Sequence, residues 1–369
     1  MGRRIAIAID SLAGGGAEKV MLTLAEGLMA QGHQVHMLVM EPFVQHKLPK
    51  GLQVTHCFKN AKNLDSFWRY RTAAKQLKAK VADIEAQDGR FDLFISNLHQ
   101  TNLLMIEAGV APLYCVLHNS PSQELKRQRA LGLFSWLDMR RAIKALNGQQ
   151  LVTVSEGIAE EVRHSSLVTP KSVTTIYNPF DFSAIEQLAA EQNVAIPEQD
   201  FIIHVGRVAR QKRHDVLFAA LAKLTHKLPL VLLCGNTKKA RKLARKADVA
   251  EQLLLPGFQQ NPYPWIKRAK LLVLSSDYEG LPTVLIEALA LGTPVVSTDC
   301  HHGPSEILTG DLARYLVPVG DADGLAVTID SALSEPPSSL AVDILAKTQQ
   351  HQVVQAYLAL GLQQHKDIL

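Results

Sequence analysis

The chain has 369 residues, of which 47% are hydrophobic and 20% charged. This composition excludes a disordered or membrane-embedded chain and is typical of a soluble globular protein with two domains. The formal charge is only +4, but the first half is the basic one, with 21 Lys and Arg against 15 Asp and Glu up to Phe180 and 18 against 20 after it. The asymmetry favours anionic partners for the first half.

Several classes of protein are not expected. The cysteines are far apart in the sequence, so we expect reduced thiols and no disulfide or zinc framework. We find no signal peptide and no apolar run long enough to cross a membrane, so we expect a cytoplasmic protein whose membrane contact is peripheral. The basic segments lack the aromatic pattern of known nucleic-acid readers, and no nucleic-acid partner is expected.

The first predicted unit is a strand over Arg4–Asp10, a glycine loop, and an amphipathic helix from about Ala17 to Gln31. A glycine loop between a strand and a helix is a candidate phosphate site, although a plain tight turn gives the same pattern. The dinucleotide fingerprint fails because Lys19 stands where its third glycine would fall. Glu41 follows the second strand and could bind a ribose, which leaves a nicotinamide oxidoreductase as an alternative.

Two basic helical segments are predicted in the first half, at 60–84 and 123–147. The first carries an apolar stripe, for which packing into the core is favoured over insertion into a membrane. Its cations lie outside this stripe. The second mixes cations with Leu133, Phe134, Trp136 and Leu137. Together they indicate docking on anionic lipid headgroups.

Further short apolar runs indicate strands with helices between them, at 91–96, 113–117, 151–154 and 173–177. This alternation predicts a doubly wound parallel sheet with functional groups at the strand ends. His118 directly follows one such strand and is either a structural hydrogen-bonding residue or a site residue. The polar stretch from Asn178 to Asp200 is interpreted as a linker region.

A second series begins with a strand at Phe201–Val205, followed by a loop with four cations in the seven residues 207–213. A solvated loop is one interpretation. Between a buried strand and a helix, however, these cations are well placed to neutralise a diphosphate.

The most informative stretch is 271–309. A buried strand at Leu271–Leu274 leads through a polar loop to a helix over Val284–Leu291, in which Glu287 is the one residue that is not apolar. Glu279 lies in the loop before the helix N-terminus, where free N–H groups favour an anion. The alternative is an ordinary βαβ unit with Glu287 bonded to a backbone N–H.

Two local patterns could indicate a metal. His301, His302 and Glu306 lie close in sequence, but adjacent histidines rarely reach one ion and a further ligand is missing, so no metal is expected. Asp321 and Asp323 form a D-x-D before a predicted helix, where N-capping is the better explanation.

The string E-G-L-P-x-x-x-x-E, from Glu279 to Glu287, is followed by A-x-A-x-G-x-P-V-V. This combination resembles the donor-nucleotide motif of family 4 glycosyltransferases. The resemblance implies the glycosyltransferase B fold, an α/β architecture in which two Rossmann-like doubly wound parallel-sheet domains face each other across a cleft. It implies an acceptor-binding domain at 1–180, a nucleotide-sugar domain at 181–345, and a C-terminal helix at 346–369 that crosses back to the first domain.

The same resemblance implies site residues. The pattern G-R-x-x-x-x-K at 206–212 matches the Arg and Lys that hold the leaving diphosphate, and Gly14, Gly15 and Gly16 match the N-terminal glycine loop. The expected catalytic residues are Glu279, His118, Arg207 and Lys212. The expected donor-binding residues are Gly15, Gly16, Gly206, Arg207, Lys212, Gly257, Phe258, Glu279, Gly280, Leu281, Pro282, Thr283 and Glu287.

The implied activity is retaining, metal-independent transfer of a hexose or N-acetylhexosamine without a cofactor, from a UDP-sugar donor. The G-P-S-E-I segment at 303–307 resembles enzymes of bacterial surface polysaccharide, which implies a lipid-linked oligosaccharide or lipopolysaccharide acceptor at the inner face of the membrane. A nucleotide-sugar epimerase or phosphorylase of the same fold, and a membrane-binding scaffold without activity, are the remaining alternatives.

Overall fold

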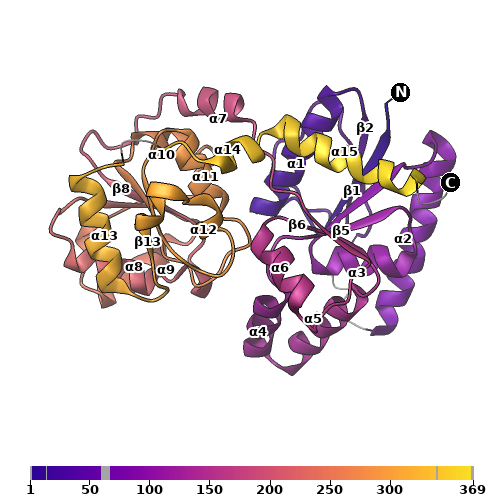
Figure 1. Ribbon diagram of the computed structural model, residues 1–369, viewed down its shortest axis with the longest axis horizontal. Helices are drawn as coiled ribbons and strands as arrows, with labels where there is room; N and C mark the ends of the chain where they lie inside the picture. Colours follow the sequence, from indigo (N-terminus) through magenta and orange to yellow (C-terminus); the bar gives the residue numbers. More distant parts are fainter. Residues whose placement is uncertain (1, 14, 60–66, 338–339, 367–369) are drawn as a thin grey trace. The chain divides into compact units, whose positions relative to one another are not determined.

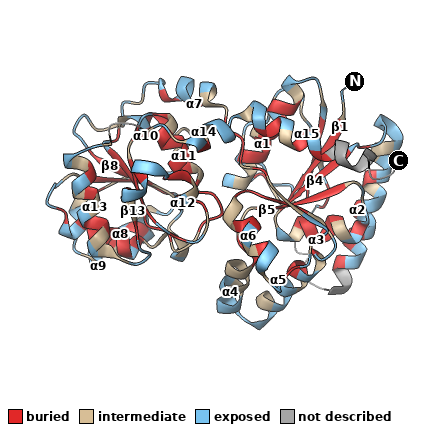
Figure 2. Cartoon of the chain, viewed as in Figure 1, coloured by how far each residue is buried: buried red, intermediate tan, exposed pale blue. Residues whose placement is uncertain are grey.

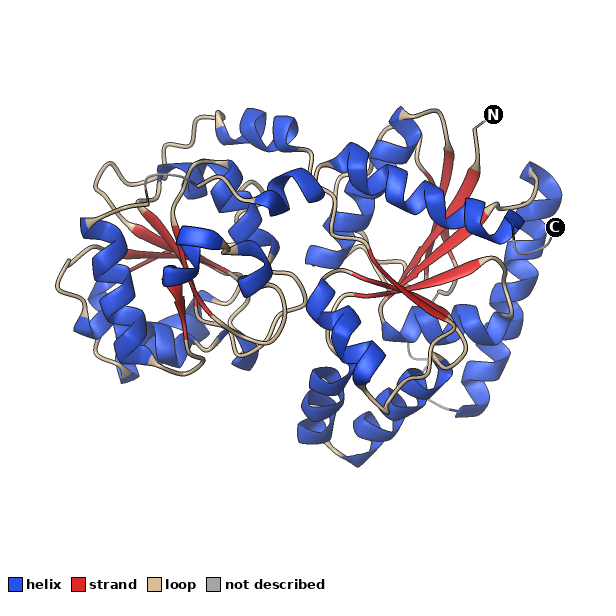
Figure 3. Cartoon of the chain, in the orientation of Figure 1, coloured by secondary structure: helices blue, strands red, loops and turns tan. Residues whose placement is uncertain are grey.

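The computed structural model describes residues 2–13, 15–59, 67–337 and 340–366. The chain forms two compact units, one comprising Met1–Phe180 with Thr348–Leu369 and the other Asp181–Lys347 (Figure 1). Each unit is a parallel sheet covered by helices (Figure 3). Among the described residues, no helix is long and apolar enough to cross a bilayer.

The first unit is built on a seven-stranded sheet with the order β3-β2-β1-β4-β5-β6-β7. Every pairing is parallel, as in the register of Ile7 with Met37 on one side and with Ile95 on the other. The strands are β1 (Arg4–Ile9), β2 (Gln34–Val39), β3 (Gln53–His56), β4 (Leu93–Asn97), β5 (Leu113–Leu117), β6 (Gln150–Thr153) and β7 (Ser172–Thr175). The strand order reverses between β1 and β4, which is where doubly wound sheets bind ligands.

The helices of this unit include one from the end of the chain. They are α1 (Gly16–Ala30), α2 (Phe67–Asp88), α3 (His99–Ala108), α4 (Pro121–Leu131), α5 (Leu133–Ala145), α6 (Glu156–His164) and α15 (Gln350–Lys366). Helix α15 packs closely on α1, because a Cβ on Gly27 would lie 2.8 Å from the side chain of Val354. The Gln350 amide also donates to the Thr23 carbonyl at 2.8 Å.

The second unit is built on a six-stranded parallel sheet with the order β10-β9-β8-β11-β12-β13. The strands are β8 (Ile202–Val205), β9 (Leu230–Leu233), β10 (Leu253–Gly257), β11 (Leu271–Leu274), β12 (Val295–Thr298) and β13 (Leu316–Val317). The helices are α7 (Phe182–Ala189), α8 (His214–Lys223), α9 (Thr237–Lys246), α10 (Tyr263–Arg268), α11 (Thr283–Ala290), α12 (Pro304–Ile307), α13 (Ala322–Ser334) and α14 (Asp343–Lys347).

The core of each unit is the centre of its sheet, where the strands are buried on both faces (Figure 2). In β11, the strand Leu271–Leu274 expected from its apolar run, every side chain is at most 1% exposed. Helix α11 begins after Pro282, and the chain turns away at Gly292, whose φ of +78° suits glycine. A strand and helix buried in this way hold the loop between them in place.

Several predicted elements differ from the structure. Part of the supposed linker is helix α7, because Asp181 accepts from the Ala184 N–H at 2.9 Å and caps it, while Ile185 and Ala189 supply a buried face. The segment 123–147 is two helices, since Gly132 at φ +131° ends one before the next begins. The C-terminal helix expected at 346–369 is α15, which begins only at Gln350, after the short helix α14.

Of the other predictions, one is confirmed, two strands were not foreseen, and one concerns residues that the structure does not describe. The Asp321 carboxylate accepts from the Gly324 N–H at 2.8 Å, so the expected N-cap of α13 is confirmed. Strands β3 and β10 were not predicted. Strand β3 has no apolar run, and the run in β10 is short, ends at Pro256 and is mostly half-buried. Residues 60–66 of the expected first basic helix lie outside the described residues.

Candidate functional site

Two neighbouring strands of the second sheet end in the loops that carry the predicted donor residues. Strands β8 and β11 pair directly, with Leu271 opposite Ile202. Because both run in the same direction, the loop after Val205 and the loop after Leu274 leave the same edge of the sheet. The strand order reverses at this pair, so the two loops lie at the switch point of the second unit.

Hydrogen bonds join these two loops along their length. The Ser275 hydroxyl donates to the Lys212 carbonyl at 2.8 Å, and the Asp277 N–H donates to the Gln211 carbonyl at the same distance. The Gln211 amide in turn donates to the Tyr278 carbonyl at 2.7 Å. Hydrogen bonds within the protein therefore hold the backbone on both sides of the site.

The two loops meet in an ion pair between Lys212 and Glu279. The Lys212 Nζ lies 2.7 Å from Glu279 Oε1, and the side chains are 19% and 11% exposed. At such burial each charge would be costly without the other, so the pair fixes both side chains. The structure thus brings together two of the residues predicted to be catalytic.

The other cations of the 206–213 loop differ in their partners. Arg213 is held within the protein, with Asp277 at 2.7 Å and Asp215 at 2.9 Å, and the hydrogen bonds that it donates to these carboxylates raise its pKa. Arg207 is exposed, and none of the carboxylates in the described residues forms an ion pair with it. Its guanidinium is therefore available to an anionic ligand, as the motif predicts.

Glu287 is buried on α11, with 7% of its surface exposed. Its Oε1 accepts from the hydroxyl of Tyr263, on α10, at 3.0 Å. A phenol leaves the carboxylate oxygens with further lone pairs to accept other donors.

The N-terminus of α11 is closely approached by another loop. Gly280, Leu281 and Pro282 are buried and Thr283 is partly exposed, and the helix has no side-chain cap. A Cβ on Gly303, which has φ +96°, would lie 2.4 Å from the Pro282 ring. A glycine is thus required at 303. The sequence placed Gly303 in the G-P-S-E-I segment but gave no sign of its contact with Pro282.

Two buried histidines beneath the loop were not singled out by the sequence. His204 is on β8 and His214 begins α8, with ring centroids 5.0 Å apart. Both nitrogens of His214 and Nε2 of His204 lack a hydrogen-bond partner among the described residues. Burial lowers the pKa of His214 to about 4 and that of His204 well below its usual value. Both rings are therefore neutral near pH 7.

Two of the expected donor-binding residues, Gly257 and Phe258, lie at the end of β10. Gly257 has φ +90°, and the next residue, Phe258, is 68% exposed. An exposed aromatic ring at a strand end is able to stack on a planar ligand.

The remaining predicted residues lie in the first unit. Gly15 is the N-cap of α1 with an extended backbone, and a Cβ there would lie 2.1 Å from the Glu18 carboxylate. Gly16 begins the helix, and a Cβ on it would meet nothing within 4 Å. Gly14 lies outside the described residues.

His118 is fixed by an asparagine on the neighbouring strand. The Asn97 amide donates to the Ala8 carbonyl at 3.1 Å, which leaves its oxygen to accept from His118 Nε2 at 2.9 Å. The Nε2 atom therefore carries the proton and Nδ1 presents a lone pair. Burial lowers the pKa of His118 to about 4, so the ring is neutral near pH 7.

A carboxyl group at the end of β1 was also missed by the sequence. Burial raises the pKa of Asp10 to about 6, although its oxygen accepts from the N–H of Thr101 at 3.0 Å. Asp10 thus places a second polar group, besides His118, at the carboxyl edge of the first sheet. A single aspartate after an apolar run gives no sign of such burial in the sequence.

Known proteins resemble the chain over nearly its whole length. The family described as "Glycosyltransferase Family 4" matches residues 14–184, and "Glycosyl transferases group 1" matches residues 186–350. A relative from Campylobacter jejuni, N-acetylgalactosamine-N,N'-diacetylbacillosaminyl-diphospho-undecaprenol 4-alpha-N-acetylgalactosaminyltransferase, is 26% identical over 360 residues, with 94% of each chain covered.

Solved structures share the fold at low identity. Sucrose-phosphate synthase from Thermosynechococcus elongatus has a TM-score of 0.75 at 19% identity and covers 99% of this chain and 98% of its own. The Anabaena protein HepE, solved with UDP-glucose, has a TM-score of 0.70 at 16% identity and covers 99% of each chain. These matches oppose the nicotinamide oxidoreductase alternative. The chain belongs to the family 4 glycosyltransferases and has the glycosyltransferase B fold.

Proposed function

We propose that this enzyme is a retaining glycosyltransferase that moves a hexose or N-acetylhexosamine from a UDP-sugar to a lipid-linked oligosaccharide or lipopolysaccharide. The observation that carries the proposal is the Lys212–Glu279 pair, which sets a cation and a carboxylate 2.7 Å apart before the N-terminus of α11. The second unit, from Asp181 onward, binds the donor, and the first unit binds the acceptor.

The leaving diphosphate gains negative charge during transfer. Lys212, Arg207 and the backbone N–H groups at the start of α11 stabilise it, in the role that a metal ion has in other glycosyltransferases. An ammonium group has three donors, so Lys212 keeps its bond to Glu279 while it binds a phosphate oxygen. No metal is required by this arrangement.

Glu279 acts on the sugar. The Lys212 ammonium bonds to Oε1, which leaves Oε2 to accept from a sugar hydroxyl and to stabilise an oxocarbenium-like centre. We favour attack of the acceptor from the same face as the leaving group, with the departing phosphate taking the acceptor's proton. Double displacement is the alternative chemical step.

The remaining donor contacts are assigned by chemistry. Glu287 accepts from the ribose hydroxyls, and Gly257 and Phe258 line the base. In the first unit, the neutral His118 contacts the donor sugar through Nδ1, and the backbone at Gly15 and Gly16 approaches the donor or acceptor without a Cβ in the way.

The relative from Campylobacter jejuni supports a lipid-linked acceptor, since its name gives a diphospho-undecaprenol substrate and it matches 94% of this chain. An acceptor of this kind lies in a membrane, so the enzyme works as a peripheral protein at the inner, anionic leaflet. We assign the contact to the basic helices α2, α4 and α5 of the first unit.

The turn between α4 and α5 has the surface that such a contact needs. Leu131, Leu133 and Phe134 are 66%, 65% and 83% exposed, and the cations Lys126 and Arg129 are exposed nearby on α4. Exposed apolar side chains beside cations are typical of segments that enter the headgroup boundary of an anionic bilayer.

A single assay tests the proposed reaction. The enzyme is incubated with UDP-hexoses and UDP-N-acetylhexosamines, each with and without a polyprenyl-diphosphate-linked glycan, and the anomeric configuration of the product is read by NMR. We expect acceptor-dependent release of UDP and retention of the donor's α configuration. Donor turnover without acceptor would instead indicate the epimerase or phosphorylase alternative, and an inverted product would contradict the proposed mechanism.

A further inference from the structure

Helix α9 presents an unusual concentration of positive charge on the donor unit. Six of its ten residues are Lys or Arg, and it has no acidic residue. Its buried positions are Ala240 and Ala244, so the helix packs through small side chains and every cation is exposed. The function proposed above uses none of these residues.

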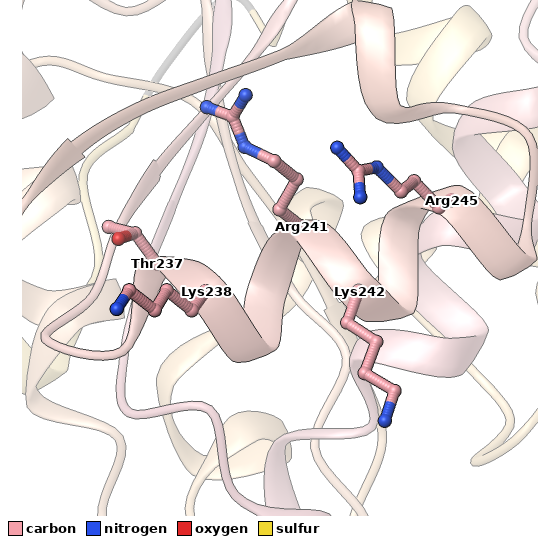
Figure 4. A pocket seen from close by; sticks show the side chains of 5 residues that line it. All are labelled: Thr237, Lys238, Arg241, Lys242 and Arg245. Carbon is pink, nitrogen blue, oxygen red and sulfur yellow. The ribbon is translucent and has the colours of Figure 1, made fainter.

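The exposed side chains line a shallow pocket of about 230 Å³. Figure 4 shows Arg241 and Arg245 leaving the same side of the helix, with Lys242 on another side and Thr237 and Lys238 near its start. Four cations and a hydroxyl thus line a space large enough for a phosphate headgroup.

These cations differ from others on the same unit in having no acidic partner. Lys223 pairs with Asp323, and Arg268 lies 3.4 Å from Asp200. Throughout the described part of the chain, by contrast, no carboxylate forms an ion pair with a residue of α9. The charge of α9 is therefore left for a partner outside the chain.

The placement of the charges is unfavourable for an isolated helix. Like charges four residues apart, as at Lys238 and Lys242 or Arg241 and Arg245, destabilise a helix. Lys238 and Lys239 also lie in the first turn, where the helix dipole disfavours cations. An anionic surface against this face would relieve both effects.

We propose that the cationic face of α9 docks on the phosphate headgroups of an anionic lipid leaflet. The face has no apolar side chain that could enter the hydrocarbon, so the contact stays at headgroup level and depends on salt. It also has no aromatic ring on which a nucleic-acid base could stack, which favours lipid over nucleic acid. This surface is distinct from the apolar turn between α4 and α5.

The contact adjoins the donor loop. The Lys239 Nζ donates to the carbonyl of Val208 at 2.9 Å, within the loop that carries Arg207 and Lys212. A lipid leaflet bound at α9 would therefore contact the second unit next to the loop that carries the proposed diphosphate site. Membrane attachment would then involve both units of the enzyme.

The test compares two triple variants that lose the same charge. One carries Arg241→Gln, Lys242→Gln and Arg245→Gln on α9, and the control carries Lys223→Gln, Lys227→Gln and Lys270→Gln elsewhere on the same unit. Each is sedimented with phosphatidylcholine vesicles that contain or lack phosphatidylglycerol. We expect the α9 variant to bind the anionic vesicles about 100-fold more weakly than the wild type, since each cation near the surface adds to the attraction.

The control variant should retain most of its vesicle binding, and both variants should be stabilised by UDP as the wild type is. Equal binding by the two variants would overturn the proposal, as would a loss of affinity for an oligonucleotide with vesicle binding intact. Because UDP binding is measured separately, failure of the lipid contact is distinguished from failure of the donor site.

Discussion

Lys212 and Glu279 are 67 residues apart in the chain and form an ion pair of 2.7 Å at the switch point of the second sheet. Hydrogen bonds between the two loops hold the pair in place, so little has to reorganise during the reaction. The pair also gives each residue two roles, because the ammonium and the carboxylate hold one another and can both contact the donor.

We expect Glu279→Gln to lower kcat by about 10²- to 10³-fold, the usual cost of losing one electrostatic contact to a transition state. Glutamine has the same shape and keeps an oxygen for Lys212, so the variant should remain folded. The control is Asp277→Asn, which removes a carboxylate two residues away whose partner Arg213 keeps Asp215. Steady-state kinetics measure kcat of both variants, and melting curves show whether they are folded. Near-normal turnover by Glu279→Gln would show that Glu279 has no role in the mechanism.

Gly303→Ala should lower the free energy of unfolding by about 2–4 kcal/mol, since it combines a left-handed backbone with overpacking against Pro282. Gly310→Ala is the matched control. It also has a positive φ, of +58°, but its Cβ would meet nothing within 4 Å, so only the backbone cost of about 1–2 kcal/mol applies. Urea unfolding measures both, and equal losses would show that the approach to Pro282 is looser than described.

The buried histidines predict a dependence of stability on pH. The unfolded chain takes up protons on His214 below its ordinary pKa of 6.5, whereas in the folded protein the pKa is about 4. The free energy of unfolding should therefore fall as the pH drops from 6.5 to 4, by up to about 3 kcal/mol from this residue. His214→Phe removes the titration and should flatten this part of the curve, and an unchanged slope in urea titrations at several pH values would contradict the assignment.

The sequence predicted those parts of the site that depend on local pattern. Strand β11 is an apolar run between polar loops, and the spacing of Glu279 and Glu287 places one in the loop and the other on α11. The position of the loop 207–213 between a strand and a helix likewise indicates a diphosphate site, while the roles of Arg207 and Lys212 come from the family resemblance.

Contacts between distant segments could not be predicted in this way. Nothing in the spacing of Lys212 and Glu279 shows that they pair, since the pairing follows from β8 lying beside β11. The unpaired nitrogens of His204 and His214 depend on the packing around them, and neither the apolar run around His204 nor the charged neighbours of His214 give a sign of that. Gly303 matters only because the loop at Pro282 comes close to it.

The turn between α4 and α5 should determine salt-resistant membrane binding. Replacing Leu133 and Phe134 with serine removes exposed apolar surface and leaves every cation in place, so we expect weaker binding to anionic vesicles at high salt and little change in melting temperature. Leu188→Ser and Val194→Ser, at exposed sites on the other unit, are the control. Equal vesicle binding by both double variants would place the membrane contact elsewhere.

The most direct test of the donor site is thermal stabilisation of the wild type and of Lys212→Ala by UDP, GDP, ADP, their sugar conjugates and NADH. A ligand that binds only the folded state raises the melting temperature. We predict a selective shift with UDP and its sugars in the wild type, largely lost in Lys212→Ala, whose own melting temperature stays close to normal. A shift with NADH alone, with no nucleotide, or of equal size in the variant would contradict a diphosphate site built on Lys212 and Glu279.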